Sequence, residues 1–217
     1  MPGIKRHIVH EIFGCTIQGE GGMVGTPCHF IRLAGCNAWS GRDEDRAASL
    51  CPFCDTQFRG GDHLTTDEIL DRLRDLPGHP HWVTISGGEP MLQVSSTLLR
   101  ALREDGWKIA IETNGTINIP RSYRRFINHL TLSPKLPRAQ TLVTECDTLK
   151  LLYPHPNPLI RPEAFADIKA KYRFLQPITP LGGTMMGDHV QVVVKALLER
   201  YPDWRLSLQT HLALGVQ

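Results

Sequence analysis

Three of the six cysteines in this 217-residue chain are spaced as one candidate metal-binding motif. Cys36, Cys51 and Cys54 have 14 and then two residues between them, and the first follows a short apolar run. A Cys-x-x-Cys pair can direct two thiolates at one centre. Three chemistries are open: a zinc site with Cys28 or His63 as fourth ligand, a redox dithiol, or a [4Fe–4S] cluster with one iron left for another ligand.

The remaining cysteines, Cys15, Cys28 and Cys146, are isolated and are predicted to be buried apolar side chains. Three disulfides are disfavoured, because a chain of this length can bury a full core without them. The first residues do not resemble a secretory signal, and no apolar run approaches the 18 residues of a membrane span. A net charge of +2 gives no strong nucleic-acid footprint. We therefore expect a cytoplasmic protein that does not span a membrane, while the charge excludes neither a small acidic ligand nor RNA.

Polar motifs stand at the carboxyl ends of four predicted strands. In parallel β/α architectures this edge carries the ligand site. A Gly-Gly pair lets the backbone approach a ligand closely, and the carboxylate that follows suits an ammonium group. Each motif alone could be a turn, but four at one edge favour a binding site; they are Ser86–Pro90, Glu112–Gly115, Ser133–Lys135 and Gln176–Pro177.

The elements that must position these motifs alternate between strands and helices. Short β-branched or aromatic runs predict six strands, at 29–33, 82–86, 108–112, 130–133, 148–152 and 172–176. Apolar spacing predicts helices at 65–76, 98–105 and 190–201, the first with capping-box spacing, and a shorter one at 121–128. This alternation favours an α/β fold with parallel strands, either an incomplete barrel or an open sheet.

The cysteine triplet with Gly87-Gly88-Glu89-Pro90 resembles the radical S-adenosylmethionine superfamily. Within it the chain is similar to 7-carboxy-7-deazaguanine synthases from about Ile8 to His211. The stretches that carry this likeness are Thr16–Gly21, Gly25–Pro27, Phe30–Asn37, Cys54–Thr56 and Glu112–Gly115. The long first gap departs from the usual three residues and resembles a variant branch, and the inserted residues 37–50 are predicted to be a solvated helix or loop. The likeness implies a partial TIM-type β/α barrel, as one domain over residues 1–217 with a cluster-binding loop at 36–56.

The resemblance implies a carbon–nitrogen lyase. Its reaction contracts the ring of 6-carboxy-5,6,7,8-tetrahydropterin to 7-carboxy-7-deazaguanine and releases ammonia, in queuosine and 7-deazapurine biosynthesis, a tRNA modification pathway. The implied cofactors are a [4Fe–4S] cluster on Cys36, Cys51 and Cys54, S-adenosyl-L-methionine on its open iron, and Mg²⁺. The radical arises on the cofactor, so no side chain is predicted to be catalytic. A homodimer and an external flavodoxin-like one-electron reductant are also implied. So is action on a small carboxypterin without direct contact with nucleic acid or membrane.

The resemblance assigns the remaining site residues. Thr56 is the expected Mg²⁺ ligand, with Asp55 as its competitor. Glu20 would accept paired N–H groups of the pterin, and Arg32 would pair with the substrate carboxylate. The substrate set is Gln18, Glu20, Arg32, Thr113, His211 and Gln217, and the S-adenosylmethionine set is Phe53, Ser86, Gly88, Glu89, Asn114, Ser133, Lys135 and Gln176. The alternatives are an activase that makes a glycyl radical on a partner enzyme and a zinc-stabilised binding module.

Overall fold

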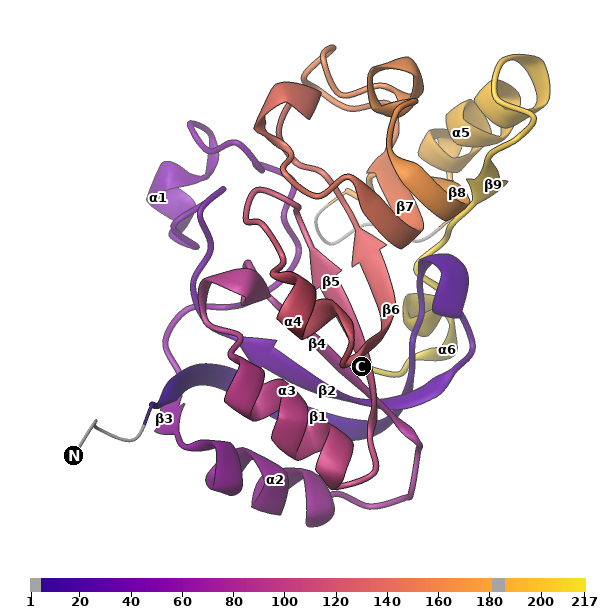
Figure 1. The fold of residues 1–217 in the computed structure, drawn as a ribbon. Coiled ribbons are helices and arrows are strands. Elements are labelled where there is room, and N and C mark those ends of the chain that lie inside the picture. The colour runs from indigo at the N-terminus through magenta and orange to yellow at the C-terminus, as the bar shows by residue number, and fades with distance from the viewer. Residues whose placement is uncertain (1–4, 181–185) are drawn as a thin grey trace. The chain divides into compact units, whose positions relative to one another are not determined.

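A computed structural model describes residues 5–180 and 186–217, in which strands and helices alternate along the chain (Figure 1). The chain divides into two compact units. Unit 1 comprises Met1–Thr16, Pro27–Glu112 and Ile119–His129; unit 2 comprises Ile17–Thr26, Thr113–Asn118 and Leu130–Gln217. Each unit brings together segments that are far apart in the sequence.

Unit 1 is built on strands in the order β3-β1-β2-β4-β5. The strand β4 pairs in parallel with both β2 and β5, whereas β3 pairs antiparallel with β1. The helices α2 and α3 lie side by side (Figure 1). The bounds are β1 His7–Ile17, β2 Pro27–Leu33, α1 Asp43–Arg46, β3 Asp62–Leu64, α2 Thr66–Arg74, β4 Trp82–Gly87, η2 Pro90–Leu92, α3 Ser96–Glu104, β5 Lys108–Thr113 and α4 Arg121–Arg124.

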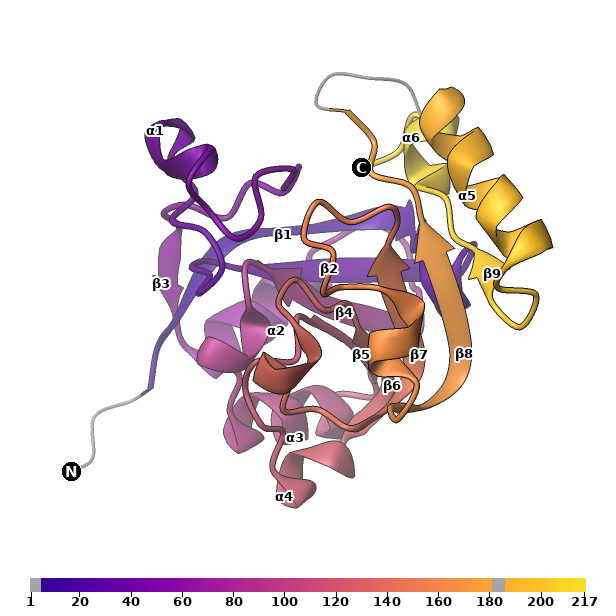
Figure 2. The same ribbon diagram turned by 90° about the horizontal axis from the view of Figure 1, so that it is seen from above.

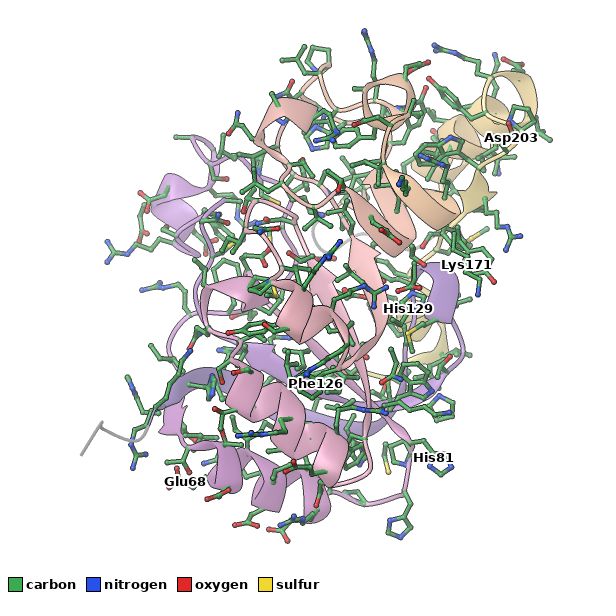
Figure 3. The ribbon with its side chains drawn as sticks, in the orientation of Figure 1. Glu68, His81, Phe126, His129, Lys171 and Asp203 are labelled. Atoms are coloured by element: carbon green, nitrogen blue, oxygen red, sulfur yellow. The ribbon has the colours of Figure 1, made fainter. Side chains whose placement is uncertain are left out.

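The apolar pattern of unit 1 explains this packing. Val83, Ile85, Ile109 and Ile111 are fully buried, as expected of parallel strands covered on both faces. The predicted capping box at the start of α2 is confirmed: the Glu68 amide donates to Thr65 Oγ1 at 3.2 Å, and the Thr65 amide donates to Glu68 Oε2 at 2.7 Å. Glu68 lies on this helix at the margin of unit 1 (Figure 3).

Unit 2 carries the parallel strands β7, β8 and β9 beside the end of β6. Its bounds are η1 Gly21–Met23, β6 Ile127–Leu132 (which begins in unit 1), η3 Arg138–Gln140, β7 Glu145–Leu152, η4 Pro162–Phe165, β8 Lys169–Gln176, α5 Asp188–Glu199, β9 Arg205–Leu206 and α6 Thr210–Leu214. The helix α5 lies along β8 and β9 (Figure 2). Val190, Val193 and Ala196 form its buried face.

The predicted α/β class with parallel strands and few helices is confirmed, with two local corrections. All six predicted strands exist, but the long strand β1 and the short β3 and β9 were missed. The helix predicted at 121–128 ends at Arg124, because Ile127 already begins β6, which ends at Leu132 rather than at Ser133. Among the described residues, no helix combines the length and the apolar character needed to cross a bilayer.

Candidate cofactor and substrate site

The turn that carries Cys36 is held by a side chain that follows η2. Gln93 Nε2 donates to the Ala34 carbonyl at 2.6 Å, and Gln93 Oε1 accepts from the Ile8 amide at 2.7 Å. The Cys36 sulfur accepts the Ala38 amide at 3.4 Å. An amide that donates to sulfur stabilises a thiolate, the form of cysteine that binds metal.

None of the three cysteines of the motif is used in a disulfide, so each can act as a metal ligand. All six cysteines of the chain are described, and none forms a disulfide. Cys28 and Cys146 are buried as predicted, whereas the prediction for Cys15 is wrong, because it is exposed. Burial raises the pKa of the Cys36 thiol, so a bound metal would be its main deprotonating partner. In the described part of the chain, no three His, Cys, Asp or Glu side chains converge on one metal-ion position.

The Gly-Gly-Glu motif after β4 packs directly on the Cys36 turn. The Glu89 amide donates to the Gly35 carbonyl at 2.9 Å. A Cβ on Gly88 would lie 2.0 Å from the Gly35 oxygen and 2.8 Å from Cys36 Cβ, so only glycine permits this approach. Glu89 is fully buried and accepts the Met91 amide at 3.0 Å, which caps η2. The motif therefore fixes the Cys36 turn by close backbone packing.

Arg32 on β2 is held by neighbours on β1. Its Nη1 pairs with Glu11 Oε1 at 2.7 Å, and the guanidinium lies 5.2 Å from the Phe13 ring, which stacks on Phe30. Arg32 Nε is buried and donates to no atom of the described residues. An anionic ligand is the natural acceptor for that donor.

In unit 2, Glu20 forms a buried ion pair with Lys150 of β7. The Lys150 side chain is 5% exposed and that of Glu20 14%. Burial alone would raise the pKa of the Glu20 carboxyl, but Lys150, helped by His211 and Gln209, lowers it to about 2. The Glu20 amide donates to Gln18 Oε1 at 3.0 Å, so two predicted substrate residues are in contact.

A buried hydroxyl links this loop to the end of β8. Ser207 Oγ donates to Gln176 Oε1 at 2.8 Å and accepts the Gly21 amide at 2.9 Å. The Thr210 amide and hydroxyl both donate to the Gly19 carbonyl, at 3.0 and 2.9 Å. A residue predicted for the cofactor is thus joined, through one serine, to the loop predicted for the substrate.

The other polar motifs of unit 2 close their own turns. Asn114 Oδ1 accepts the Thr116 amide at 2.9 Å, and Thr113 Oγ1 accepts the Gly115 amide at 3.1 Å. The Ser133 amide donates to the Thr113 carbonyl at 2.8 Å, which joins two strand-end motifs. Lys135 Nζ donates to Ser133 Oγ at 2.6 Å. All of these residues are buried except Thr116 and Lys135, which are half-buried.

The predicted residues therefore fall into two sets, one in each unit. Unit 1 holds Arg32, Cys36, Cys51, Phe53, Cys54, Thr56, Ser86, Gly88 and Glu89, and unit 2 holds Gln18, Glu20, Thr113, Asn114, Ser133, Lys135, Gln176, His211 and Gln217. Thr56 Oγ1 donates to the exposed Asp55 at 3.4 Å, and Gln217 is exposed.

Sequence reasoning missed four residues that hold these sets in place. They are Arg46 and Gln93 in unit 1 and Lys150 and Ser207 in unit 2. Lys150 had a visible signal, as the charged residue inside the apolar predicted strand 148–152. Ser207 and Gln93 had none, because their partners lie far away in sequence.

Comparison with known proteins defines the class and then the family. The Radical SAM superfamily profile matches residues 46–135, so this part of the chain is similar to radical S-adenosylmethionine proteins. It is 40% identical to the 7-carboxy-7-deazaguanine synthase of Bordetella pertussis (strain Tohama I) and 38% identical to that of Caulobacter vibrioides, in each case over 96% of this chain and 98% of the relative. The chain belongs to the 7-carboxy-7-deazaguanine synthase family.

The structural comparison agrees in fold. A crystal structure of QueE from Escherichia coli matches with a TM-score of 0.65 at 24% sequence identity, over 93% of each chain. The predicted fold class is thereby confirmed. Family membership likewise confirms the prediction of an enzyme that uses an iron–sulfur cluster and S-adenosylmethionine. It overturns the alternative of a zinc-stabilised binding module without catalysis.

Proposed function

We propose that this chain contracts the ring of 6-carboxy-5,6,7,8-tetrahydropterin to 7-carboxy-7-deazaguanine with release of ammonia, for queuosine and related 7-deazapurines. Membership of the family supports the reaction. The observation in the chain itself that carries the substrate assignment is the buried, ionised Glu20. A carboxylate kept anionic in a buried loop is suited to the paired N–H donors of a pterin edge.

Residues of unit 1 would hold the cluster and part of S-adenosylmethionine. Cys36, Cys51 and Cys54 would each bind one iron, and the backbone at Gly88 would lie against the cofactor. When bound, the cluster supplies the electron that starts radical chemistry on S-adenosylmethionine. Glu89 would accept the cofactor's ammonium, because a carboxylate is the natural partner of an ammonium group.

The other proposed cofactor contacts match each part of S-adenosylmethionine to a side chain of suitable polarity. The buried amides and hydroxyls of unit 2 offer donors and acceptors to the ribose and carboxylate of S-adenosylmethionine, and Phe53 offers an apolar surface to its adenine. We assign this role to Asn114, Ser133, Lys135 and Gln176, together with Ser86 and Phe53 of unit 1.

The substrate residues would orient the pterin by its two polar ends. Glu20 and Gln18 would read the nitrogen-rich edge, and Arg32 would bind the carboxylate through the Nε donor that lacks an acceptor among the described residues. Thr113, His211 and Gln217 complete the proposed set. We also propose Mg²⁺ on Thr56, a homodimer, a flavodoxin-like reductant and a cytoplasmic setting, the last supported by six cysteines without a disulfide.

An activase that makes a glycyl radical on a partner is the competing function, because it shares the cysteines and the glycine motif. The discriminating feature is Glu20 with Gln18, which reads a small heterocycle and has no use in a protein-docking activase.

The test is anaerobic incubation of the reconstituted protein with S-adenosylmethionine, reductant, Mg²⁺ and the carboxypterin, followed by mass analysis of the products. We expect 7-carboxy-7-deazaguanine from the wild type and a large loss of turnover in Glu20→Gln with the cluster intact. Glu44→Gln, an exposed position in the insertion, is the matched control and should retain activity. Unchanged turnover in Glu20→Gln would contradict the substrate assignment.

A further inference from the structure

The insertion at residues 37–50 has no role in the proposed reaction, yet it has an ordered interior. Its short helix α1 lies apart from α2 and α3 at the outer end of the cysteine loop (Figures 1 and 2). Trp39 is only 7% exposed, and its Nε1 donates to the Arg42 carbonyl at 3.0 Å. Its ring meets the buried Phe58 edge-on at 5.6 Å. The insertion therefore folds around one tryptophan.

Arg46, the last residue of α1, connects that tryptophan to the second half of the cysteine motif. Its Nη1 donates to the Cys54 carbonyl at 2.7 Å and to the Pro52 carbonyl at 3.3 Å. The guanidinium carbon lies 4.1 Å from the centre of the Trp39 ring. The Nε and Nη2 atoms donate to Asp43 Oδ1 at 3.2 and 3.1 Å. One guanidinium thus stacks on a ring and donates along a plane, which an ammonium group cannot do.

The contacts of Arg46 constrain the Cys51–Cys54 turn, which the long gap between Cys36 and Cys51 would otherwise leave loosely held. A loop of 14 residues between Cys36 and Cys51 leaves the Cys51-x-x-Cys54 turn without the local constraint that a three-residue gap would give. The turn has one internal bond, from the Cys54 amide to the Cys51 carbonyl at 3.1 Å. Arg46 adds bonds to two more carbonyls of the same turn and brings a positive charge beside it.

We propose that Arg46 is a positioning residue for the iron–sulfur cluster, which fixes the Cys51–Cys54 turn through its carbonyls and makes the cluster easier to reduce. This inference rests on the proposed function in one respect, that the three cysteines hold the cluster. A positive charge close to a cluster stabilises its reduced, more negative form. The exposed pair with Asp43 contributes little, because Asp43 is 89% exposed and surface ion pairs are weak.

The experiment compares wild type, Arg46→Met, Arg46→Lys and Asp43→Asn, with Arg42→Met as an exposed control in the same insertion. Each protein is reconstituted anaerobically. Iron and acid-labile sulfide are measured, and the midpoint potential is taken from an EPR-monitored titration without S-adenosylmethionine. We expect Arg46→Met to lose cluster content and to shift the potential to more negative values. Arg46→Lys should also lose content but keep a potential near that of the wild type, whereas Asp43→Asn and Arg42→Met should match the wild type.

A readout in the metal-free protein guards against simple misfolding. Amide hydrogen exchange should accelerate in residues 51–56 of Arg46→Met while the exchange of β2 and β4 stays unchanged. Wild-type cluster content and potential in Arg46→Met would overturn the inference, and so would an equal loss in Asp43→Asn. A wild-type protein that takes up iron but no sulfide would instead refute the proposed function, and the inference with it.

Discussion

Replacing Lys150 with methionine should destabilise the protein strongly, because it strands the buried Glu20 carboxylate. Methionine keeps most of the apolar length of the lysine and removes only the ammonium. Both side chains of the pair are largely buried, at 5% and 14% exposure. Removing one partner of a buried pair costs about 3–5 kcal/mol, because an uncompensated charge remains inside.

The pKa of Glu20 gives a second route to the same magnitude. Lowering that pKa from 4.5 to about 2 corresponds to about 3 kcal/mol of stability at neutral pH. Typical domains have a free energy of unfolding of about 5–15 kcal/mol, so the loss is large but survivable.

The effect should depend on pH in a defined direction. In the wild type the depressed pKa of Glu20 contributes stability above pH 4.5, which is lost as the pH falls toward 2. Without Lys150, burial dominates and the pKa rises above its ordinary value, so protonation stabilises the folded variant. The difference between the two proteins should therefore be largest near pH 7 and should shrink in acid.

Urea unfolding of the metal-free proteins at about pH 7.5 and at about pH 4.5, close to the ordinary pKa of a glutamate carboxyl, measures this difference. Lys195→Met is the matched control, because Lys195 is 73% exposed and its pair with Glu199 is long, at 4.0 Å. We expect it to change the free energy of unfolding by less than about 0.5 kcal/mol. The double variant Glu20→Gln with Lys150→Met should recover part of the lost stability. A loss below about 1 kcal/mol, or the same loss at both pH values, would refute the reasoning.

Three further predictions use the same structure. Ser207→Ala leaves two buried partners unsatisfied and should lower the free energy of unfolding by about 1–3 kcal/mol in urea titrations. Gly88→Ala places a Cβ 2.0 Å from the Gly35 oxygen, so it should reduce both cluster content, read from the visible absorbance, and S-adenosylmethionine binding, read by calorimetry. Burial and the nearby Lys135 lower the pKa of His155 to about 4. Its NMR ring signals should therefore titrate near pH 4. The stability that the neutral ring contributes above pH 6.5 should be lost as the pH falls toward 4.

The sequence predicted the elements that repeat a strong local pattern. The apolar strands β2, β4 and β5 and the capped helix α2 were found because their own residues specify them. The eleven-residue strand β1 was missed, since His10, Glu11 and Gly14 interrupt its apolar residues and most of it is half-buried. Its pairing with other strands, rather than local preference, keeps it extended.

The residues of the candidate site also differ in whether local sequence is enough to recognise them. Motifs whose chemistry lies in adjacent residues, such as Gly88-Glu89 and the cysteine triplet, can be recognised from the order of the amino acids alone. Ser207 cannot be recognised in this way, because its partners lie 31 and 186 residues away. Lys150 stands out as a charge in an apolar strand, but its partner, 130 residues away, cannot be identified from the sequence. Long-range electrostatics and buried polar contacts appear only when the strands are paired.

The contacts of Asn114, Thr113 and Glu89 determine which substitutions can separate ligand binding from folding at these positions. Each of these side chains accepts a backbone amide two residues ahead, so the interpretation as a turn residue is right for all three. The same three side chains are proposed to contact the cofactor or the substrate. A turn closed by its own side chain also has less entropy to lose when a ligand binds. Truncation to alanine removes both functions at once, so only a substitution that preserves the accepting oxygen can separate binding from folding at these positions.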